Sequence, residues 1–491
     1  MLQSRWASAS MPAPEPLAQA LHAARLIGAE AELVLHGGGN TSVKLERDGR
    51  QVLYVKGSGA DLARVSAHDY TPLDLAATRA LLDDAGLENG RMYAALAPHV
   101  LDPQAPRPSI ETLMHAGLPP AHVIHTHAAS ILAIANTRRA ATHLRAAFGT
   151  SAPVVDYQHS GVALARACVA AWHAADAALA DGLILAHHGA LAWGHSAGEA
   201  YERMLGLANR ADAYLDAHGA PNPPADNACR PADLSRQTLL EIARLRADAC
   251  RSAGRALVAT LRDDAAMRAF TGRSDLAAIT NHGPSTPGHA IFTKRIPLVG
   301  RDVERFASAY RGYLEGSKVV DCAPRIALDP AFGMLALGVT KRHADIAADV
   351  YAHDAAIIAR ATALNRYATV GTHLLRMAEL EYAGFEARVA RDLPLAGRVY
   401  VIDRAMERGA LISELLERGA AVAAIAAHAQ VTTLFDTPAF LGLHCTAATA
   451  DDPTCADVLQ RLVRAFGGVD VVDAAPAWQT VFSPFREIGN A

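Results

Sequence analysis

Two histidines spaced two residues apart close one of the apolar runs of this chain. The run Ala121-His122-Val123-Ile124 leads into His125-Thr126-His127, and a second apolar run, 182–186, leads into His187-His188-Gly189. Residues i and i+2 of a β-strand point to the same face of a sheet, so the pattern predicts that His125 and His127 present their imidazoles to one point. His188 follows a second buried strand, from which it can complete a three-histidine set.

Three neutral imidazoles with an open fourth position are a ligand set of catalytic zinc. The pattern therefore indicates a metal centre at the ends of two buried strands. The alternative is that these histidines are hydrogen-bonded structural residues, since the chain contains 22 histidines and most histidines in proteins are not ligands.

Two further patterns lie upstream of the histidine pair. The string Pro108-Ser109-Ile110-Glu111-Thr112 predicts a helix start, with Ser109 as the N-cap and Glu111 in the first turn. A carboxylate is thereby expected near the metal. The glycine-rich turns at 37–42 and 57–59 are of the kind whose backbone N–H groups can cradle a phosphate.

In their order along the chain these motifs resemble the class II aldolase/adducin family. The likeness is greatest to the aldolase part of the bifunctional rhamnulose-1-phosphate aldolase/short-chain dehydrogenase proteins, and it continues more loosely through 283–294. The motifs are Gly-Gly-Asn-Thr-Ser at 38–42, Lys-Gly-Ser-Gly at 56–59, Pro-Ser-Ile-Glu-Thr at 108–112, His-Thr-His at 125–127 and His-His-Gly-Ala-Leu-Ala-Trp-Gly at 187–194.

The resemblance implies a particular active site. In that site His125, His127 and His188 bind Zn²⁺, and Glu111 is the catalytic acid/base. Tyr157 falls where smaller class II aldolases have a functional tyrosine, which would give a proton to the leaving aldehyde oxygen. An ordinary tyrosine at the edge of the core is the alternative for this position.

The same resemblance implies a phosphate cradle made of small residues from three motifs. These residues are Gly39, Asn40, Ser58, Gly59 and Ser109. Ile110 departs from the family, because simpler members have a second serine there, and Gly288 stands where longer relatives usually have an aspartate. The two differences leave part of the cradle and the choice of substrate open.

The leading hypothesis is a zinc-dependent aldolase that cleaves a ketose 1-phosphate, such as rhamnulose 1-phosphate, into dihydroxyacetone phosphate and an aldehyde. Zinc would stabilise the enediolate that cleavage leaves behind. A lysine Schiff base is disfavoured, because lysines are scarce and Lys56 alone lies in a motif. Two alternatives stay open, a sugar-phosphate epimerase or dehydratase on the same zinc site and a non-catalytic adducin-like interaction protein.

The positions of proline- and glycine-rich breaks in the sequence predict an α/β protein of three parts. A class II aldolase-like αβα domain over 1–220 ends with a helix over 196–217 and a proline-rich stretch. A second α/β region over 230–390 and a C-terminal partial Rossmann-like segment over 395–491 follow. In the second region we expect helices over 234–270, strands over 291–299 and 325–338, and an alanine-rich helix over 342–364.

The C-terminal part resembles a truncated short-chain dehydrogenase that has lost its cofactor site. Residues 397–423 have the β-α-β rhythm of a Rossmann half. Bulky side chains at 403–408 replace the family's glycine-rich turn, and no tyrosine or lysine follows Tyr400 to form a Tyr-x-x-x-Lys pair. We therefore expect no binding of NAD or NADP.

Composition limits the other partners. The net charge of −4 and the absence of a basic run argue against nucleic acid, and no apolar stretch is long enough to suggest a membrane span. Since the N-terminus also lacks the apolar region of a signal peptide, we expect a cytoplasmic protein. Its partner would be a small-molecule sugar phosphate, and the family resemblance implies a homo-oligomer.

Overall fold

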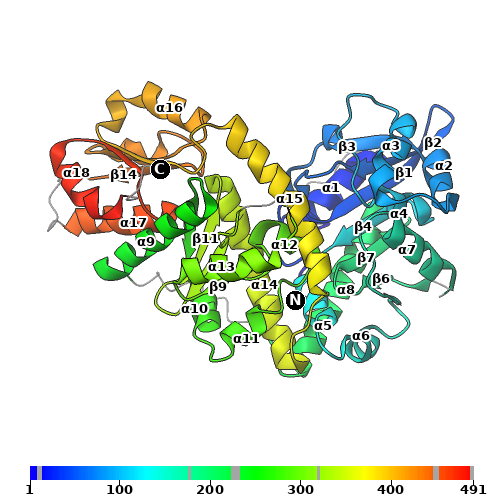
Figure 1. Cartoon of the computed structure of the whole chain (residues 1–491). Coiled ribbons are helices and arrows are strands. Elements are labelled where there is room, and N and C mark those ends of the chain that lie inside the picture. The colour runs from blue at the N-terminus through cyan, green and yellow to red at the C-terminus, as the bar shows by residue number, and fades with distance from the viewer. Residues whose placement is uncertain (8–13, 175–178, 223–232, 318–320, 446–452, 487–491) are drawn as a thin grey trace. The chain divides into compact units, whose positions relative to one another are not determined.

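The chain has a mixed α/β fold that divides into two compact units (Figure 1). The first unit comprises Met1–Asn222 and Ala356–Thr369, and the second comprises Pro223–Ala355 and Val370–Ala491. The computed structural model describes residues 1–7, 14–174, 179–222, 233–317, 321–445 and 453–486. Within those ranges no helix is both long and apolar enough to cross a bilayer.

One mixed sheet forms the centre of the first unit. Its described strands run in the order β3-β2-β1-β4-β7-β6-β5, and the site strands β4 and β7 are antiparallel neighbours in the middle. The strands are β1 (Asn40–Arg47), β2 (Arg50–Lys56), β3 (Tyr70–Asp74), β4 (His122–Thr126), β5 (Val154–Val155), β6 (Gly182–Leu185) and β7 (Gly189–Gly194).

Helices cover both faces of this sheet, because its central strands carry apolar side chains on both sides. Ile124 and Ala190 face one layer, and Val123 and Leu191 face the other. The first layer contains α1 (Pro16–Gly28), α5 (Ala129–Ala135), α6 (Ala140–Phe148) and α8 (Ala197–Ala217). The second layer contains α2 (Leu75–Ala80), α3 (Asn89–Leu96), α4 (Thr112–Gly117) and α7 (Val162–Ala174). The αβα arrangement expected from the sequence is confirmed.

The second unit begins with a four-stranded sheet in the order β8-β11-β10-β9. The hairpin of β10 and β11 and the long helix α14 confirm the elements expected over 325–338 and 342–364. The strands are β8 (Val258–Arg262), β9 (Leu298–Val299), β10 (Ile326–Asp329) and β11 (Gly333–Gly338). The helices are α9 (Arg236–Ala253), α10 (Ala265–Thr271), α11 (Leu276–Thr280), α12 (Pro287–Thr293), α13 (Val303–Tyr313) and the part of α14 (Lys341–Asn365) up to Ala355, since its remaining residues belong to the first unit.

The helices expected over 234–270 are present as α9 and α10, with strand β8 between them. The strand expected over 291–299 is wrong for most of its length. The segment 291–293 belongs to α12 instead of a strand, and only Leu298–Val299 is extended. The physical reason is a helix start at Thr286-Pro287, where the Thr286 hydroxyl accepts a hydrogen bond from the His289 amide and proline occupies the first helical position.

The C-terminal sheet is fully parallel and has the order β14-β13-β12-β15. This is the strand order of a Rossmann half, so the expected partial Rossmann-like segment is confirmed. Its strands are β12 (Val399–Ile402), β13 (Ala421–Ala426), β14 (Phe440–His444) and β15 (Val471–Asp473). Helices α16 (Gly409–Glu417), α17 (Pro453–Phe466) and α18 (Pro476–Phe482) accompany this sheet, whereas α15 (Thr372–Asp392), which precedes it in the chain, packs against α12.

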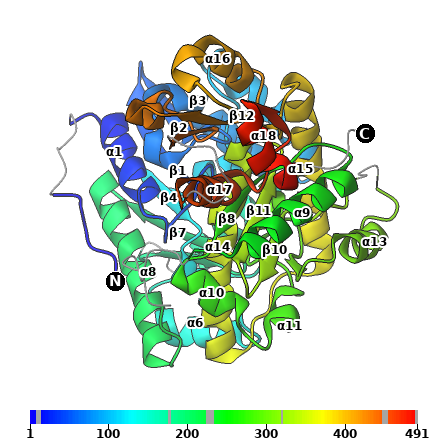
Figure 2. The ribbon, with the colours of Figure 1, turned by 90° about the vertical axis from the view of Figure 1, so that its left-hand side faces the viewer.

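The two sheets of the second unit share one hydrophobic core. Helix α17 packs against β8 and α9, as Figure 2 shows, and the buried side chains of β12 join those of β8 and β11 in one cluster. Arg246 of α9 forms a two-point ion pair with Asp470, at 2.7 and 3.1 Å, and both side chains are 1% exposed. Asp470 also accepts a hydrogen bond from the Val399 amide of β12.

We expect Asp470→Asn to lower the free energy of unfolding of the second unit by about 3–5 kcal/mol. The substitution keeps the shape of the side chain but removes the carboxylate charge that pairs with the buried Arg246. Urea titration measures the effect. Asp248→Asn is the matched control, because Asp248 pairs with Arg251 on the exposed side of α9 and such pairs contribute about 0–1 kcal/mol. Equal effects of the two substitutions would contradict the prediction.

Candidate active site

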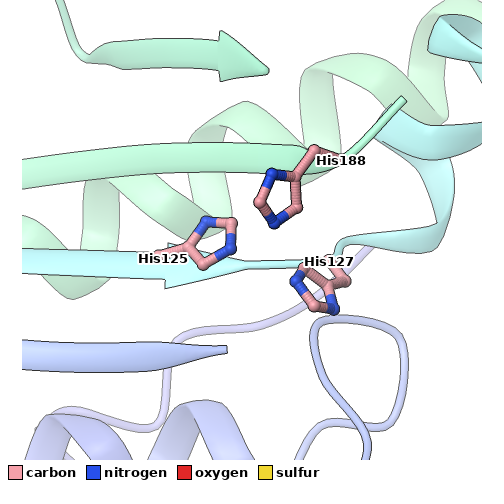
Figure 3. Close-up of side chains that lie close together, drawn as sticks. All are labelled: His125, His127 and His188. Carbon is pink, nitrogen blue, oxygen red and sulfur yellow. The ribbon is translucent and has the colours of Figure 1, made fainter. Parts of the chain in front are cut away.

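Three histidines from two neighbouring strands converge in the first unit (Figure 3). His125 lies in β4, His127 lies one residue beyond the end of that strand, and His188 lies in the turn between β6 and β7. The nitrogen atoms they offer all lie within 4.8 Å of one another, and this is the one group of at least three potential metal ligands in the described part of the chain. The convergence predicted from the two apolar runs is present.

Glycine at position 189 makes this convergence possible. Gly189 has φ +153°, and a Cβ atom there would lie 2.0 Å from the carbonyl oxygen of Thr126. A side chain at position 189 would therefore push β7 away from β4. Because β7 can approach this closely, His188 comes to lie beside His125, with 4.9 Å between the ring centroids.

The donor atoms fit a divalent metal that prefers imidazole. The Nδ1–H of His125 donates to the Ala190 carbonyl at 3.0 Å, and its buried Nε2 has no hydrogen-bond partner. Burial lowers the pKa of His125 to about 4, so the ring is neutral near pH 7 and Nε2 carries a free lone pair. A backbone carbonyl on the far ring nitrogen is the arrangement that orients metal-binding histidines. The residues present therefore fit Zn²⁺.

The carboxylate of Glu111 lies against the histidine cluster. Its Oε1 lies 3.1 Å from His188 Nε2, and its Oε2 lies 3.5 Å from His125 Nε2. Asn40 donates to Oε2 at 2.6 Å. Burial by itself would raise the pKa of Glu111, but the two histidines and the hydrogen bonds from His188 and Asn40 hold that pKa well below its usual range. An ionised carboxylate next to the metal position can accept a proton.

Ser109 is not the N-cap of the helix. Helix α4 begins at Thr112, so Glu111 occupies the N-cap position, although its side chain makes no capping hydrogen bond. Ser109 instead lies in the preceding turn, where its hydroxyl accepts the Glu111 amide at 3.2 Å and its carbonyl accepts the Thr112 amide at 3.1 Å. The turn delays the helix by two residues and thereby turns the Glu111 side chain toward the histidines.

The five candidate phosphate contacts lie in two places. Asn40 and Ser109 are buried beside Glu111 and joined by a hydrogen bond of 3.1 Å. Gly39 precedes Asn40 at φ +59°, and a Cβ there would lie 2.8 Å from the His125 carbonyl oxygen. Ser58 and Gly59 are exposed beyond the end of β2. The Ser58 amide donates to the Arg107 carbonyl at 2.8 Å, so this N–H is not available to an anion, contrary to our expectation for the turn.

Lys56 joins the two glycine-rich turns. Its buried ammonium donates to the carbonyls of Gly37, at 2.9 Å, and Ala60, at 2.7 Å. Burial lowers the pKa of Lys56 to about 8. These hydrogen bonds hold the two turns next to each other.

Tyr157 lies outside the three-histidine cluster. It follows β5 and packs edge-on against His187, the neighbour of His188, with 6.5 Å between ring centroids. Burial raises the pKa of Tyr157. His159 interacts with the Asn89 side chain and the Ser160 carbonyl through Nδ1.

His115 is a site residue that the sequence reading missed. It is fully buried in α4 and lies between Ser42 and Asn40, with hydrogen bonds to both side chains. The available signal was its spacing, because residues four apart on a helix share a face and His115 follows Glu111 by four. A single buried histidine in a helix does not by itself indicate a site, and its partners on β1 are not apparent from the local sequence.

The parallel C-terminal sheet has its topological switch point at β12, which lies between β13 and β15. Dinucleotides bind at such points, outside the carboxyl ends of the strands. Here the Arg408 side chain pairs with the Asp473 carboxylate and also donates to the Asp473 carbonyl at 2.9 Å. Asp403, at the end of β12, accepts the Ala475 amide at 2.7 Å. These contacts join the ends of β12 and β15 directly.

Comparison with known families agrees with the fold. Residues 18–215 match the class II aldolase and adducin N-terminal domain, and residues 236–388 match the second domain of class II aldolases. The chain belongs to the class II aldolase/adducin family.

Individual relatives extend over different parts of the chain. A Bacillus subtilis (strain 168) protein described as the uncharacterized oxidoreductase YuxG is 26% identical over 525 aligned residues, covering 96% of this chain and 74% of the relative. Among solved structures, the N-terminal class II aldolase domain of a conserved Thermoplasma acidophilum protein is 32% identical and covers 44% of this chain and 100% of its own, with a TM-score of 0.40. The L-fuculose-1-phosphate aldolase of Thermus thermophilus is 18% identical and covers 40% of this chain and 93% of its own, with a TM-score of 0.27.

Proposed function

We propose that this chain is a zinc-dependent aldolase that cleaves a ketose 1-phosphate, of the rhamnulose 1-phosphate type, into dihydroxyacetone phosphate and an aldehyde. The observation that supports the proposal most strongly is the buried carboxylate of Glu111 lying 3.1 Å from His188 and 3.5 Å from His125. A metal site and a proton acceptor are thereby side by side, which is what carbon–carbon cleavage of a ketose requires.

In this proposal His125, His127 and His188 hold the zinc. When bound, zinc supplies Lewis-acid stabilisation of the negative charge that develops on the substrate's oxygens. Glu111 accepts the proton released during cleavage and returns it to the carbon of the dihydroxyacetone phosphate product. Asn40 keeps the Glu111 carboxylate in place through its 2.6 Å hydrogen bond. Tyr157 is proposed to hydrogen-bond the oxygen that becomes the aldehyde, and it gives that oxygen a proton only in the reverse, condensation direction.

The proposed phosphate contacts come from Asn40 and Ser109 within the buried site and from Gly39, Ser58 and Gly59 in the glycine-rich turns. The chemistry fits an uncharged cradle of hydroxyl and amide groups for a phosphate monoester. Because the Ser58 amide is already bonded, we assign its hydroxyl to this role.

A combined measurement tests the proposed function. Elemental analysis of the purified protein should give about one zinc per chain, and incubation with a panel of ketose 1-phosphates should release dihydroxyacetone phosphate. Product identity separates the open alternatives, because an epimerase returns an isomeric sugar phosphate, a dehydratase releases water, and an adducin-like protein changes none of the substrates. Zinc-loaded protein that cleaves no ketose phosphate would overturn the aldolase assignment.

We also propose a division into a class II aldolase-like domain over 1–220, a second α/β region over 230–390 and a dehydrogenase-like remnant over 395–491. In its native setting we propose a cytoplasmic homo-oligomer with no nucleic-acid partner.

We expect no measurable binding of NAD or NADP by the C-terminal segment. The Bacillus subtilis relative is described as an oxidoreductase, so dinucleotide binding is the natural alternative. In this chain the Arg408–Asp473 pair joins the strand ends at which a pyrophosphate would enter, and arginine and glutamate replace the glycines that allow close approach. Calorimetric titration of the full chain is the measurement, and a micromolar dissociation constant for either dinucleotide would contradict the expectation.

A further inference from the structure

A buried chain of hydrogen bonds leads away from the Glu111 carboxylate. Asn40 donates to Glu111 Oε2 at 2.6 Å, His115 Nε2 bonds the other end of the Asn40 amide at Oδ1, and Ser42 Oγ lies 2.7 Å from His115 Nδ1. All four residues are buried, with at most 4% of each exposed. His115 therefore lies behind Asn40, away from the proposed metal.

Regular structure explains why these four side chains meet. Asn40 and Ser42 are two residues apart on β1 and point to the same face of the sheet. Glu111 and His115 are four residues apart, at the N-cap and inside α4, so they share one face of that helix. The paired spacing lets His115 reach both strand residues while Glu111 reaches the histidine cluster.

Donor and acceptor chemistry fixes the direction of the chain. A carboxylate oxygen only accepts, so Asn40 must turn its NH₂ group toward Glu111. Its carbonyl Oδ1 then faces His115 Nε2, which must carry the proton. Burial lowers the pKa of His115 to about 3, so the ring holds a single proton near pH 7. Nδ1 must therefore accept the hydroxyl proton of Ser42.

We propose that His115 is a positioning residue: its Nε2–H group holds the carboxamide of Asn40 with the NH₂ side toward Glu111 and Ser109. This inference rests on the proposed function for its effect on turnover. Without His115 the carboxamide loses its contact at Oδ1 and is held from one side only, so that its NH₂ group can swing away from Glu111 and Ser109. Ser42 acts one step further out by selecting the tautomer of His115.

Steady-state kinetics of a double-mutant cycle test the proposal. We expect His115→Leu to lower kcat about ten- to hundredfold, the usual loss when an outer partner of a site is removed. His115→Gln should recover most of the activity, because its amide can donate to Asn40 Oδ1. In an Asn40→Ala background His115→Leu should have little further effect, since the two residues act through one contact. Independent, multiplicative losses would overturn the proposal.

His122→Leu is the matched control, because His122 is a buried histidine at the far end of β4 whose pKa burial also lowers, to about 4. It should cost stability but leave kcat unchanged. Zinc content and thermal midpoint of every variant separate loss of fold from loss of positioning. A His122 substitution that reduced kcat as much as His115→Leu would mean that any buried histidine of this unit has the same effect.

A measurement that does not involve turnover keeps this inference separate from the proposed function. In protein labelled with ¹⁵N-histidine, the NMR signals lost in His115→Gln belong to His115. They should show the Nε2–H tautomer and no titration between about pH 5 and 8, the range in which unperturbed histidines titrate. An Nδ1–H tautomer or ordinary titration would refute the positioning role, whereas a protein with the expected tautomer but no ketose-phosphate cleavage would refute only the aldolase assignment.

Discussion

Glu111→Gln is expected to lower the turnover of a cleaved ketose phosphate about 10²- to 10⁴-fold, the usual contribution of general acid–base catalysis. Glutamine keeps the size of the side chain and one acceptor oxygen but cannot take a proton. Zinc and fold should be retained, as elemental analysis and thermal unfolding can verify.

Glu88→Gln is the control for this result. Glu88 occupies the N-cap of α3, and like Glu111 it makes no side-chain capping hydrogen bond. A carboxylate that only stabilises a helix start contributes under about 1 kcal/mol, so Glu88→Gln should leave turnover nearly intact. A Glu111→Gln enzyme within a few-fold of the native one would remove Glu111 from the mechanism, and loss of zinc in that variant would make Glu111 a fourth ligand.

Removing a histidine of the cluster should have a larger effect than Glu111→Gln, because it removes a proposed zinc ligand. His127→Ala and His188→Ala each delete one of three proposed ligands, so zinc affinity should fall by more than the ten- to hundredfold typical of losing an outer partner. Activity at low zinc should be lost in parallel. Zinc titration against a competing chelator, together with elemental analysis, measures the affinity.

The neighbouring histidine supplies the matched control. His187 precedes His188 but bonds the Asn136 side chain through Nδ1. Because its φ is +56°, His187→Asn is the suitable change, since asparagine tolerates positive φ. It should keep the native zinc affinity. Undiminished zinc in His127→Ala or His188→Ala would contradict the proposed ligand set.

The histidine cluster was predictable because its geometry follows from strand periodicity. His125 and His127 follow from the alternation of β4 continued one residue beyond its end, and His188 follows from its place in the turn before β7, the neighbour of β4. The sequence also predicted that the Glu111 carboxylate lies near the histidines. It did not predict the turn at Ser109 that orients this carboxylate. Whether Ser109 caps the helix or lies in a turn before it depends on a distant contact, since the Ser109 amide donates to the Lys56 carbonyl.

Local sequence patterns did not predict contacts between segments that are far apart in the sequence. His115 acquires its place only when α4 packs over β1, which no periodicity reveals. The run 291–299 contains enough branched and apolar residues to suggest a strand, yet the Thr286-Pro287 helix start upstream decides its first three residues. In both cases the local sequence is not sufficient to predict the structure, because a hydrogen bond or packing contact with another segment determines it.

The shared core of the second unit determines which unit can fold first while the chain is being synthesised. All described strands of the first unit's sheet have been made once residue 194 is translated, so that sheet can begin to form while the rest of the chain is still emerging. The core around β8 and α9 also contains Phe466, Trp478 and Phe485. That core cannot close until these residues have left the ribosome, and until then its apolar strands stay exposed and prone to aggregation.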